Sequence, residues 1–282
     1  MIFSKFIPLD YKLEDYTLNN FSLPPENKEN KSNNEKFYEI FHYSSLYAAT
    51  FEKMNDIDEC TYSVAMNNID IRNQKLARLI FCFNFDDTLE KNKELHKKYT
   101  RYNFEEDLMW AHYANGCCGV RINFEIPEPY SVSEKDNYKE DTKDKKIIFP
   151  VKYDDKLLRV NNQSEAMDKI IEIMTRKKKC WSYEQEYRAI FNKDTQLQYE
   201  NRNPVPKNRF PIKIEDIILG RKFCTTKFYE PSKENERTFD NHIICIARQI
   251  MNVIEETQRK KRLYNKLPRI LAYKTMYSEK PF

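Results

Sequence analysis

Two glutamates and an arginine alternate within one short segment of the chain. Glu184, Glu186 and Arg188 occupy every second position in the middle of WSYEQEYRAIF, residues 181–191. On a β-strand this spacing places the three side chains on one face. Two carboxylates beside an arginine can stabilise a cation or transfer a proton if that face lines a cleft. The alternative is a solvated face on which the glutamates pair with Arg188.

A second polar group lies early in the chain, within FYEIFHYSSLYAAT, residues 37–50. The density of aromatic and β-branched residues predicts a strand there, followed by a turn and a second short strand. His42 and Ser44 then share one strand face, and Tyr43 and Tyr47 supply aromatic rings close by. The plainer interpretation of His42 is a hydrogen-bonded core histidine.

The chain order of these two groups resembles that of ADP-ribosyltransferases, which place a polar histidine or arginine on an early strand and a glutamate on a late one. Cleavage of the nicotinamide–ribose bond of NAD generates an oxocarbenium-like cation, which a carboxylate stabilises. The resemblance implies NAD as the substrate and a nucleic acid or a protein as the acceptor. It implies these roles: catalysis by Glu186, Glu184 and His42, ribose binding by His42 and Ser44, and stacking on nicotinamide by Tyr43 or Tyr47.

A third polar group joins a helix to the strand that follows it. Residues 104–115 predict a helix, which Gly116 ends in the left-handed conformation. Residues 118–126 predict a strand with one apolar and one polar face. This connection can bring His112, Arg121 and Trp110 to the Glu184 and Glu186 face as substrate-binding residues. The alternative is simple packing of the helix on the sheet.

Three segments taken together resemble one bacterial family. They are LYAATFEKMNDIDEC at residues 46–60, DLMWAHYANGCCGVRINF at residues 107–124 and KKKCWSYEQEYRAIF at residues 177–191. Their W-x-H-Y and W-x-Y-E-x-E-x-R signatures resemble those of the domain-of-unknown-function family numbered 2971, over roughly residues 37–277. The chain departs from the family at Ile57, where a proline is usual, and at Cys117-Cys118, where a histidine is usual. The resemblance implies a fold and a set of clustered polar residues, but no reaction.

Several classes of protein are disfavoured by composition. Three glycines are too few and too scattered for a G-x-G-x-x-G or Walker loop, which argues against glycine-rich dinucleotide-binding folds and P-loop NTPases. The seven cysteines form no C-x-x-C pair, which indicates reduced thiols. No apolar run approaches a membrane span, and the N-terminus lacks a signal pattern, so we expect a cytoplasmic protein without a membrane anchor.

A metal site is not expected from the four histidines, because no two of them have a ligand spacing. An acidic Mg²⁺ site that joins Asp56 and Glu59 to the two late glutamates remains an alternative, and it would suit a nuclease. Two basic runs, residues 176–179 and 259–262, either hold a phosphate-bearing substrate or form solvated helix ends.

The predicted elements mix helices with strands and lack a steady βαβ alternation. Further strands are expected at residues 79–85, 147–153, 213–220 and 267–277, and further helices at residues 164–179 and from Asp240 onward. We therefore predict an α+β fold with a mixed or mostly antiparallel sheet and flanking helices. Residues 1–36 are expected to form an N-terminal arm and flexible linker, and residues 37–282 a single domain.

The function predicted first is an ADP-ribosyltransferase-like or NAD-cleaving enzyme, with a role as a bacterial toxin or phage-defence effector. A metal-dependent nuclease or other nucleic-acid-processing protein is the second prediction. A non-catalytic sensor or interaction domain is the third, and it requires the polar strand face to lie open with the glutamates paired to Arg188 and Arg121. The sequence does not indicate the oligomeric state.

Overall fold

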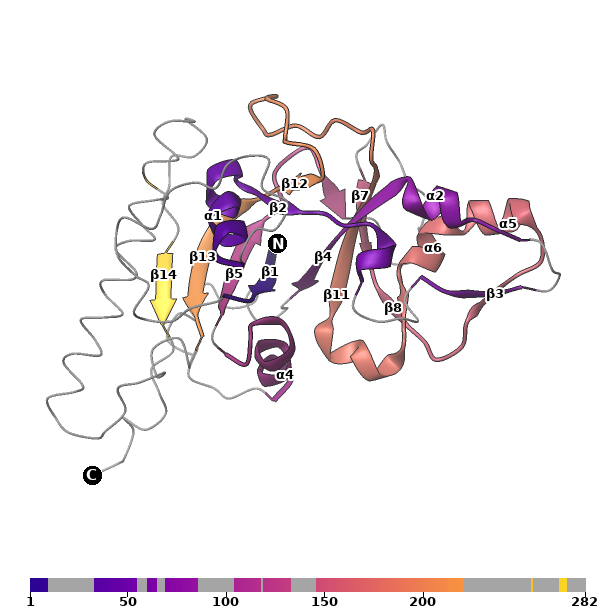
Figure 1. Cartoon of the computed structure of the whole chain (residues 1–282), viewed down its shortest axis with the longest axis horizontal. Coiled ribbons are helices and arrows are strands. Elements are labelled where there is room, and N and C mark those ends of the chain that lie inside the picture. The colour runs from indigo at the N-terminus through magenta and orange to yellow at the C-terminus, as the bar shows by residue number, and fades with distance from the viewer. Residues whose placement is uncertain are drawn as a thin grey trace, which may run out of the picture. The chain divides into compact units, whose positions relative to one another are not determined.

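A computed structural model of the chain describes residues 1–9, 33–54, 60–64, 69–85, 104–117, 119–132, 146–220, 255 and 269–272. The chain divides into two compact units. Unit 1 contains residues 45–86 and 126–212 with Met1, and unit 2 contains residues 2–44, 87–125 and 213–282. Helices and strands occur in both units (Figure 1), so the prediction of an α+β fold is confirmed. None of the described helices is both long and apolar enough to cross a membrane.

Unit 1 is organised around β11 (Glu186–Asn192). This strand pairs antiparallel with β4 (Arg78–Phe85) on one side and with β7 (Lys146–Pro150) on the other. β6 (Ser131–Val132) then pairs parallel with β7. Because β11 has a neighbour on each side, its backbone groups can pair with two strands. Five of its seven residues are buried, with members on both faces of the strand.

Short elements surround these strands in unit 1. Three two-stranded pairs form: β2 (Ser45–Tyr47) with β12 (Arg209–Pro211), β3 (Tyr62–Val64) with β9 (Leu158–Val160), and β8 (Lys152–Tyr153) with β10 (Arg176–Lys177). The helical elements are η3 (Phe51–Lys53), α2 (Arg72–Leu76), α5 (Gln163–Asp168), α6 (Ile170–Met174) and η5 (Lys179–Glu184). The N-cap Asn162 accepts a hydrogen bond from the Glu165 backbone N–H at 2.8 Å, which fixes the start of α5.

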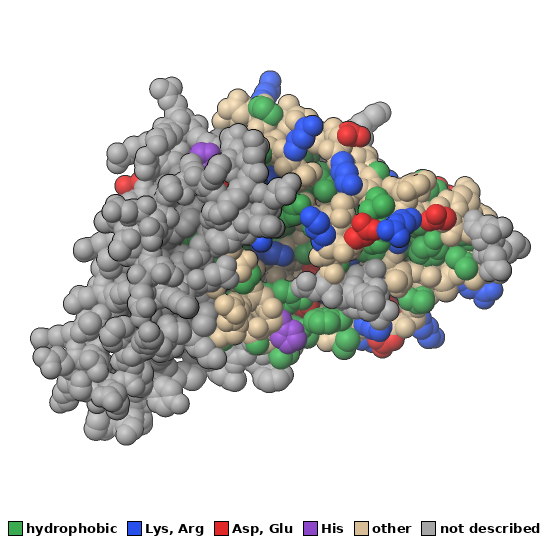
Figure 2. Space-filling model, viewed as in Figure 1, with side chains coloured by type: hydrophobic (Ala, Val, Ile, Leu, Met, Phe, Trp, Pro, Cys, Tyr) green, Lys and Arg blue, Asp and Glu red, His purple; other side chains and the backbone are tan. Residues whose placement is uncertain are grey.

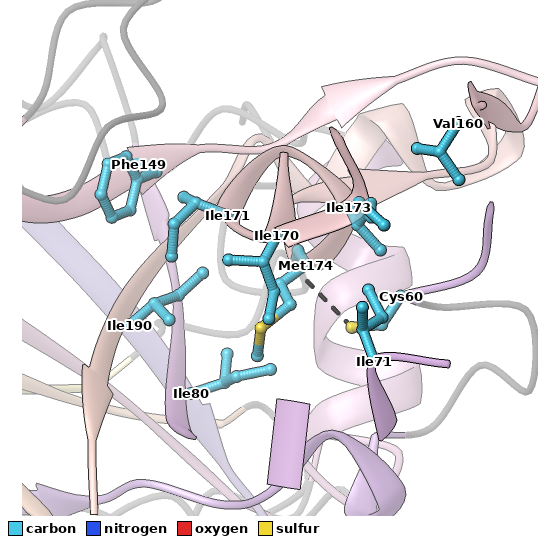
Figure 3. Close-up of a cluster of buried hydrophobic side chains, with 11 residues drawn as sticks. Cys60, Ile71, Ile80, Phe149, Val160, Ile170, Ile171, Ile173, Met174 and Ile190 are labelled. Atoms are coloured by element: carbon cyan, nitrogen blue, oxygen red, sulfur yellow. Dashed lines mark hydrogen bonds between the residues drawn. The ribbon is translucent and has the colours of Figure 1, made fainter. Parts of the chain in front are cut away.

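The apolar core of unit 1 lies where α6 packs on the strands. Ile170, Ile171 and Met174 of α6 point toward Ile80 of β4 and Ile190 of β11 (Figure 3). All five side chains are at least nine-tenths buried. Four of the five residues of α6 are apolar and buried, because the helix is covered on more than one side.

Unit 2 contains four strands in the order β14, β13, β5 and β1. β5 (Val120–Glu125) pairs antiparallel with β1 (Ile2–Ile7) and with β13 (Lys213–Leu219), and β13 pairs parallel with β14 (Arg269–Ala272). The helices are α1 (Asn33–Tyr43) and α4 (Phe104–Tyr113). Trp110 of α4 meets the Phe6 ring of β1 edge to face, with 5.0 Å between ring centroids.

The connection from α4 to β5 depends on two glycines. Gly116 has a φ of 62°, the left-handed conformation predicted for the end of the helix. Gly119 lies where a Cβ atom would overlap the carbonyl oxygen of Ile7. Glycine at this position therefore lets the backbone entering β5 approach the end of β1.

The elements with an unambiguous apolar period were predicted correctly. The helix expected at residues 104–115 is α4, and the strands expected at 79–85, 118–126 and 213–220 are β4, β5 and β13. The closing strand expected at residues 267–277 is confirmed over β14. The helix expected from Asp240 lies outside the described residues, apart from helical Glu255.

The strand expected in residues 37–44 is wrong, because residues 33–43 form α1. Phe37, Ile40 and Phe41 follow the i, i+3, i+4 spacing of a helix and are all buried. The aromatic and β-branched side chains favoured a strand in the prediction, whereas the spacing of the apolar residues is that of the observed helix. Only residues 45–47, as β2, are extended as expected.

Two other boundaries differ from the predictions. The strand expected over residues 181–191 begins only at Glu186, because η5 and a left-handed Gln185 precede it. The helix expected over residues 164–179 is α5 and α6, separated at Lys169 and followed by β10.

Residues 2–7, expected within an arm, form β1 of unit 2. The assignment of residues 37–282 to one domain stays a prediction.

The core of unit 1 gives a first test by mutation. Ile173→Ala is expected to lower the free energy of unfolding by about 2–5 kcal/mol, because Ile173 is completely buried and its truncation leaves a cavity. The measurement is urea unfolding followed by circular dichroism. Leu157→Ala is the matched control, since Leu157 is 53% exposed and its loss is expected to change stability by less than about 0.5 kcal/mol. Equal effects of the two variants would contradict the assigned core.

Candidate functional site

The late glutamates and the arginine lie where the chain passes from β10 through a short 3-10 helix into β11. β10 leads into η5, and η5 ends at Glu184. Gln185 then adopts a left-handed conformation with φ of 45°, and Glu186 opens β11. This turn moves Glu184 out of the strand alternation, yet both carboxylates remain beside Lys177 of β10.

Four charged side chains form one connected ion network. The Lys177 ammonium lies 2.6 Å from Glu184 Oε2 and 3.2 Å from Glu186 Oε2. Arg188 contacts Glu186 from the other side, through Nε at 2.8 Å from Oε1 and Nη2 at 3.2 Å from Oε2. Glu186 therefore lies between a lysine and a bidentate arginine, and we call these four residues the ion network.

The ion network is shielded from solvent. The side chains of Lys177, Glu184 and Glu186 are 4%, 3% and 4% exposed, and that of Arg188 is 0% exposed. Two cations and two carboxylates are present, so the formal charges balance. This balance matters because an unpaired charge at such a depth is strongly disfavoured.

Neighbouring polar groups fix the positions of the charged ones. Arg188 Nη1 donates to the Met174 carbonyl oxygen at 2.6 Å, at the end of α6. The Glu186 backbone N–H donates to the Tyr153 hydroxyl oxygen at 2.8 Å, and the Asn84 side chain donates to the Glu184 carbonyl oxygen at 2.6 Å. Elements far apart in the sequence thus hold the network in one geometry.

The protonation states follow from burial and from charge. Burial by itself would raise the pKa of Glu186, but the charges of Arg188 and Lys177 and hydrogen bonds from Arg188 and Cys82 lower this pKa well below its usual value. Glu186 is therefore ionised at neutral pH. Burial, and next the charge of Glu186, raises the pKa of Tyr153, so this phenol stays protonated.

The Lys177 ammonium also marks a cation site with an aromatic wall. It lies 4.9 Å from the centroid of the Trp181 ring as well as beside the two carboxylates. An indole face and carboxylate oxygens are groups that favour positive charge. Chemically, this arrangement is suited to stabilise a cation.

The predicted alternative of a solvated strand face is wrong for these residues, since all of them are buried. The pairing of Glu186 with Arg188 in that alternative is correct. The basic run at residues 176–179 was expected to lie at a cleft rim or at a solvated helix end. Instead Arg176 and Lys177 are buried, and only Lys178 and Lys179 are exposed. The run at residues 259–262 lies outside the described residues.

The other predicted site residues have different settings. His42 and Tyr43 end α1, with their rings 4.5 Å apart edge to face, and Ser44 follows them in a buried position with a φ of 46°. All three belong to unit 2, whereas Glu186 belongs to unit 1, so the convergence of His42 and Ser44 with Glu186 stays a prediction. Tyr47 lies in β2 and is exposed.

The helix–strand group lies in unit 2. Trp110 is buried against Phe6, which agrees with the packing alternative, and His112 is exposed on α4. Arg121 is buried in β5, where its Nε donates to Asn123 Oδ1 at 3.0 Å. Their predicted role in substrate binding is not tested by these contacts.

Lys177 was not singled out as a site residue by its sequence position. It lies in a run of four basic residues, which is typical of solvated chain. The only local signal is that the run is flanked by apolar Met174 and Trp181.

Among the described residues no three histidine, cysteine, aspartate or glutamate side chains form a metal-binding cluster. Asp56 and Glu59, named for the alternative Mg²⁺ site, lie outside the described residues.

Part of the chain is similar to a protein family described as of unknown function. A family model described as "Protein of unknown function (DUF2971)" matches residues 109–189, from α4 to the middle of β11. The resemblance drawn from the W-x-H-Y and W-x-Y-E-x-E-x-R signatures is thereby confirmed. No match was found among curated proteins or among solved structures.

The ion network predicts a large effect of removing one partner. Arg188→Met is expected to lower the free energy of unfolding by about 3–5 kcal/mol, because Glu186 then loses its bidentate partner while buried. Adding Glu186→Leu to this variant should restore much of the loss, since Lys177 and Glu184 still neutralise each other. Urea unfolding of the single and double variants measures the coupling. Arg72→Met, which breaks an exposed pair with Glu52, should cost less than about 1 kcal/mol.

The lowered pKa of Glu186 predicts a dependence of stability on pH. The unfolded chain protonates this carboxyl near its usual pKa of about 4.3, whereas the folded chain resists protonation. Stability from Glu186 is thus present above about pH 5 and is lost as the pH falls toward its folded pKa. Glu186→Gln should flatten the rise of the unfolding free energy between about pH 3 and pH 6. The control variant Glu200→Gln, which removes an exposed carboxylate of unit 1, should keep most of the wild-type slope. An unchanged slope in Glu186→Gln would contradict the assignment.

Proposed function

We propose that this chain, which matches a family of unknown function over residues 109–189, is an NAD-cleaving enzyme of the ADP-ribosyltransferase-like kind. The observation that supports the proposal is the cation site between Glu184 and Glu186. Cleavage of NAD at the nicotinamide–ribose bond creates positive charge on the ribose, and enzymes accelerate such a step by fixing negative charge beside it. The two carboxylates are the groups that would supply this charge.

The Lys177 ammonium indicates where a substrate cation would bind. It lies 2.6 Å and 3.2 Å from oxygens of the two carboxylates and near the Trp181 ring. A nicotinamide ribosyl group carries a positive charge and a flat ring, so the same carboxylates and the same indole face suit it. Binding of this group requires the Lys177 side chain to move away, after which the substrate takes over its electrostatic role.

Glu186 is the better candidate for the catalytic carboxylate. Arg188 holds it with two hydrogen bonds, and its backbone N–H is fixed on Tyr153. A carboxylate held in place before the substrate binds needs little reorganisation in the transition state. Its lowered pKa keeps it ionised, which the stabilisation of a cation requires. Glu184 shares the cation with it and is the second carboxylate of the proposal.

The proposal includes ligands from the early polar group. His42 and Ser44 are proposed to bind the ribose, and Tyr43 or Tyr47 to stack on nicotinamide. A protein or nucleic-acid acceptor would turn NAD cleavage into ADP-ribosyl transfer. The proposed cellular role is that of a toxin or phage-defence effector, for which NAD loss in cells that express the protein is the direct readout.

The test is the release of nicotinamide from NAD by the purified protein, with and without cell lysate or nucleic acid. Glu186→Gln is expected to lower the release rate by about 10²–10³-fold, because it removes one charge from beside the developing cation. The variant keeps the size and the hydrogen-bonding ability of the side chain. Thermal unfolding recorded on the same samples separates lost chemistry from lost fold.

The matched control is Glu165→Gln, which removes a lysine-paired carboxylate from the surface of unit 1. It is expected to release nicotinamide at the wild-type rate. Wild-type protein that neither binds NAD nor releases nicotinamide under any of these conditions would overturn the proposal. Release that survives in a folded Glu186→Gln variant would remove Glu186 from the catalytic role.

A further inference from the structure

The loop between β11 and β12 encloses a small pocket in unit 1. Its volume is about 120 Å³, and its wall runs from Phe191, near the end of β11, to Arg209 at the start of β12. Phe191 is an odd-numbered position of β11, whereas Glu186 and Arg188 are even-numbered and face the other side of the strand. Five residues of strand separate Glu186 from Phe191, about 17 Å. The pocket is therefore distinct from the ion network.

The charged side chains of the pocket lining are mostly basic. Lys193, Lys207 and Arg209 line it together with one carboxylate, that of Asp194. Within the described part of the chain, the ammonium groups of Lys193 and Lys207 form no ion pair. In Figure 2 basic side chains lie over the loop that precedes β12, on the face turned to the viewer. An excess of positive charge in a concave site raises the local concentration of anions.

Arg209 gives the pocket a buried charge. Its residue is only 9% exposed, and its Nη1 donates to the Ser45 carbonyl oxygen at 3.2 Å. This hydrogen bond orients the guanidinium where the loop meets β2. A buried, oriented guanidinium is the group that proteins use most often to recognise phosphate geometry.

The loop itself is held closed by its own hydrogen bonds. The Val205 backbone N–H donates to the Leu197 carbonyl oxygen at 2.8 Å, and the Gln196 side chain donates to the carbonyl oxygens of both residues at 2.8 Å and 3.1 Å. The Asn208 carbonyl oxygen accepts from the Ala48 backbone N–H at 2.9 Å. These bonds tie both ends of the loop, so a ligand meets a formed pocket and little ordering is needed.

The size of the pocket limits the ligand. Sites for whole cofactors and drug-sized molecules have volumes of about 300–1,000 Å³, so this pocket takes only a small group. We propose that it binds a phosphate-sized oxyanion, either inorganic phosphate or the phosphoryl group of a ligand whose remainder lies outside. Lys193, Lys207 and Arg209 are the residues that would neutralise its charge.

The experiment is a calorimetric titration of the full chain at low ionic strength. Inorganic phosphate and ribose 5-phosphate are titrated separately. The double variant Lys193→Gln/Lys207→Gln is expected to weaken binding at least about tenfold, because two charge-assisted contacts are lost. Both lysines are exposed, so the variant should fold as the wild type does, and circular dichroism checks this. Tighter binding of one of the two probes identifies free phosphate or a phosphoryl group as the ligand.

The matched control is Lys156→Gln/Lys178→Gln, which removes the same charge from exposed lysines elsewhere in unit 1. It should bind both probes within about twofold of the wild type, as expected for surface changes away from the site. The proposal is overturned by the absence of binding of both probes at millimolar concentrations. It is also overturned by equal weakening in the two double variants, which would show that only net charge matters.

Discussion

Unit 1 depends on the neutralisation of charge inside a low-dielectric interior. Arg188 is completely buried on β11, so this strand can pair with β4 and β7 only if a carboxylate accompanies the arginine. Glu186 provides that carboxylate, and Lys177, which contacts both carboxylates, balances the remaining charge of Glu184. The contact of Lys177 of β10 with both carboxylates meets this requirement, since an uncompensated carboxylate there would be strongly destabilising.

The apolar core and the ion network share one residue at their border. The Met174 side chain packs among the isoleucines, while its carbonyl oxygen accepts from Arg188 and from the Cys60 thiol. The last turn of α6 leaves carbonyl groups without helical partners, and Arg188 satisfies one of them. Packing and charge compensation are therefore coupled through a single backbone group. A shift of α6 would change the hydrogen bonding of Arg188, and a substitution of Arg188 would change how α6 is held on the strands.

Sequence patterns predicted the elements whose apolar residues repeat with a clear period. They failed where the residue types favoured one secondary structure and the spacing of the apolar residues favoured another. β4, β5, β13 and α4 follow from apolar alternation or from a helix ended by glycine. α1 was mistaken for a strand because its aromatic residues outweighed their helical spacing. Within the candidate site, the shared face of Glu186 and Arg188 follows from alternation, but their burial does not. Alternation shows which side chains face together, whereas the cover of that face, here the end of α6 and Lys177, is a tertiary property.

The ion network is local in the sequence, although its surroundings are not. Its pairs join residues 7, 9 and 2 positions apart, while the bond from Asn84 to Glu184 spans 100 positions. Short loops close fast and with little loss of chain entropy. The charges can thus compensate one another within one turn of chain before β4 arrives from its distant position. We therefore expect β4 to meet, during folding, a partner that is already electrically neutral, so that the slow long-range step does not have to desolvate four separate ions.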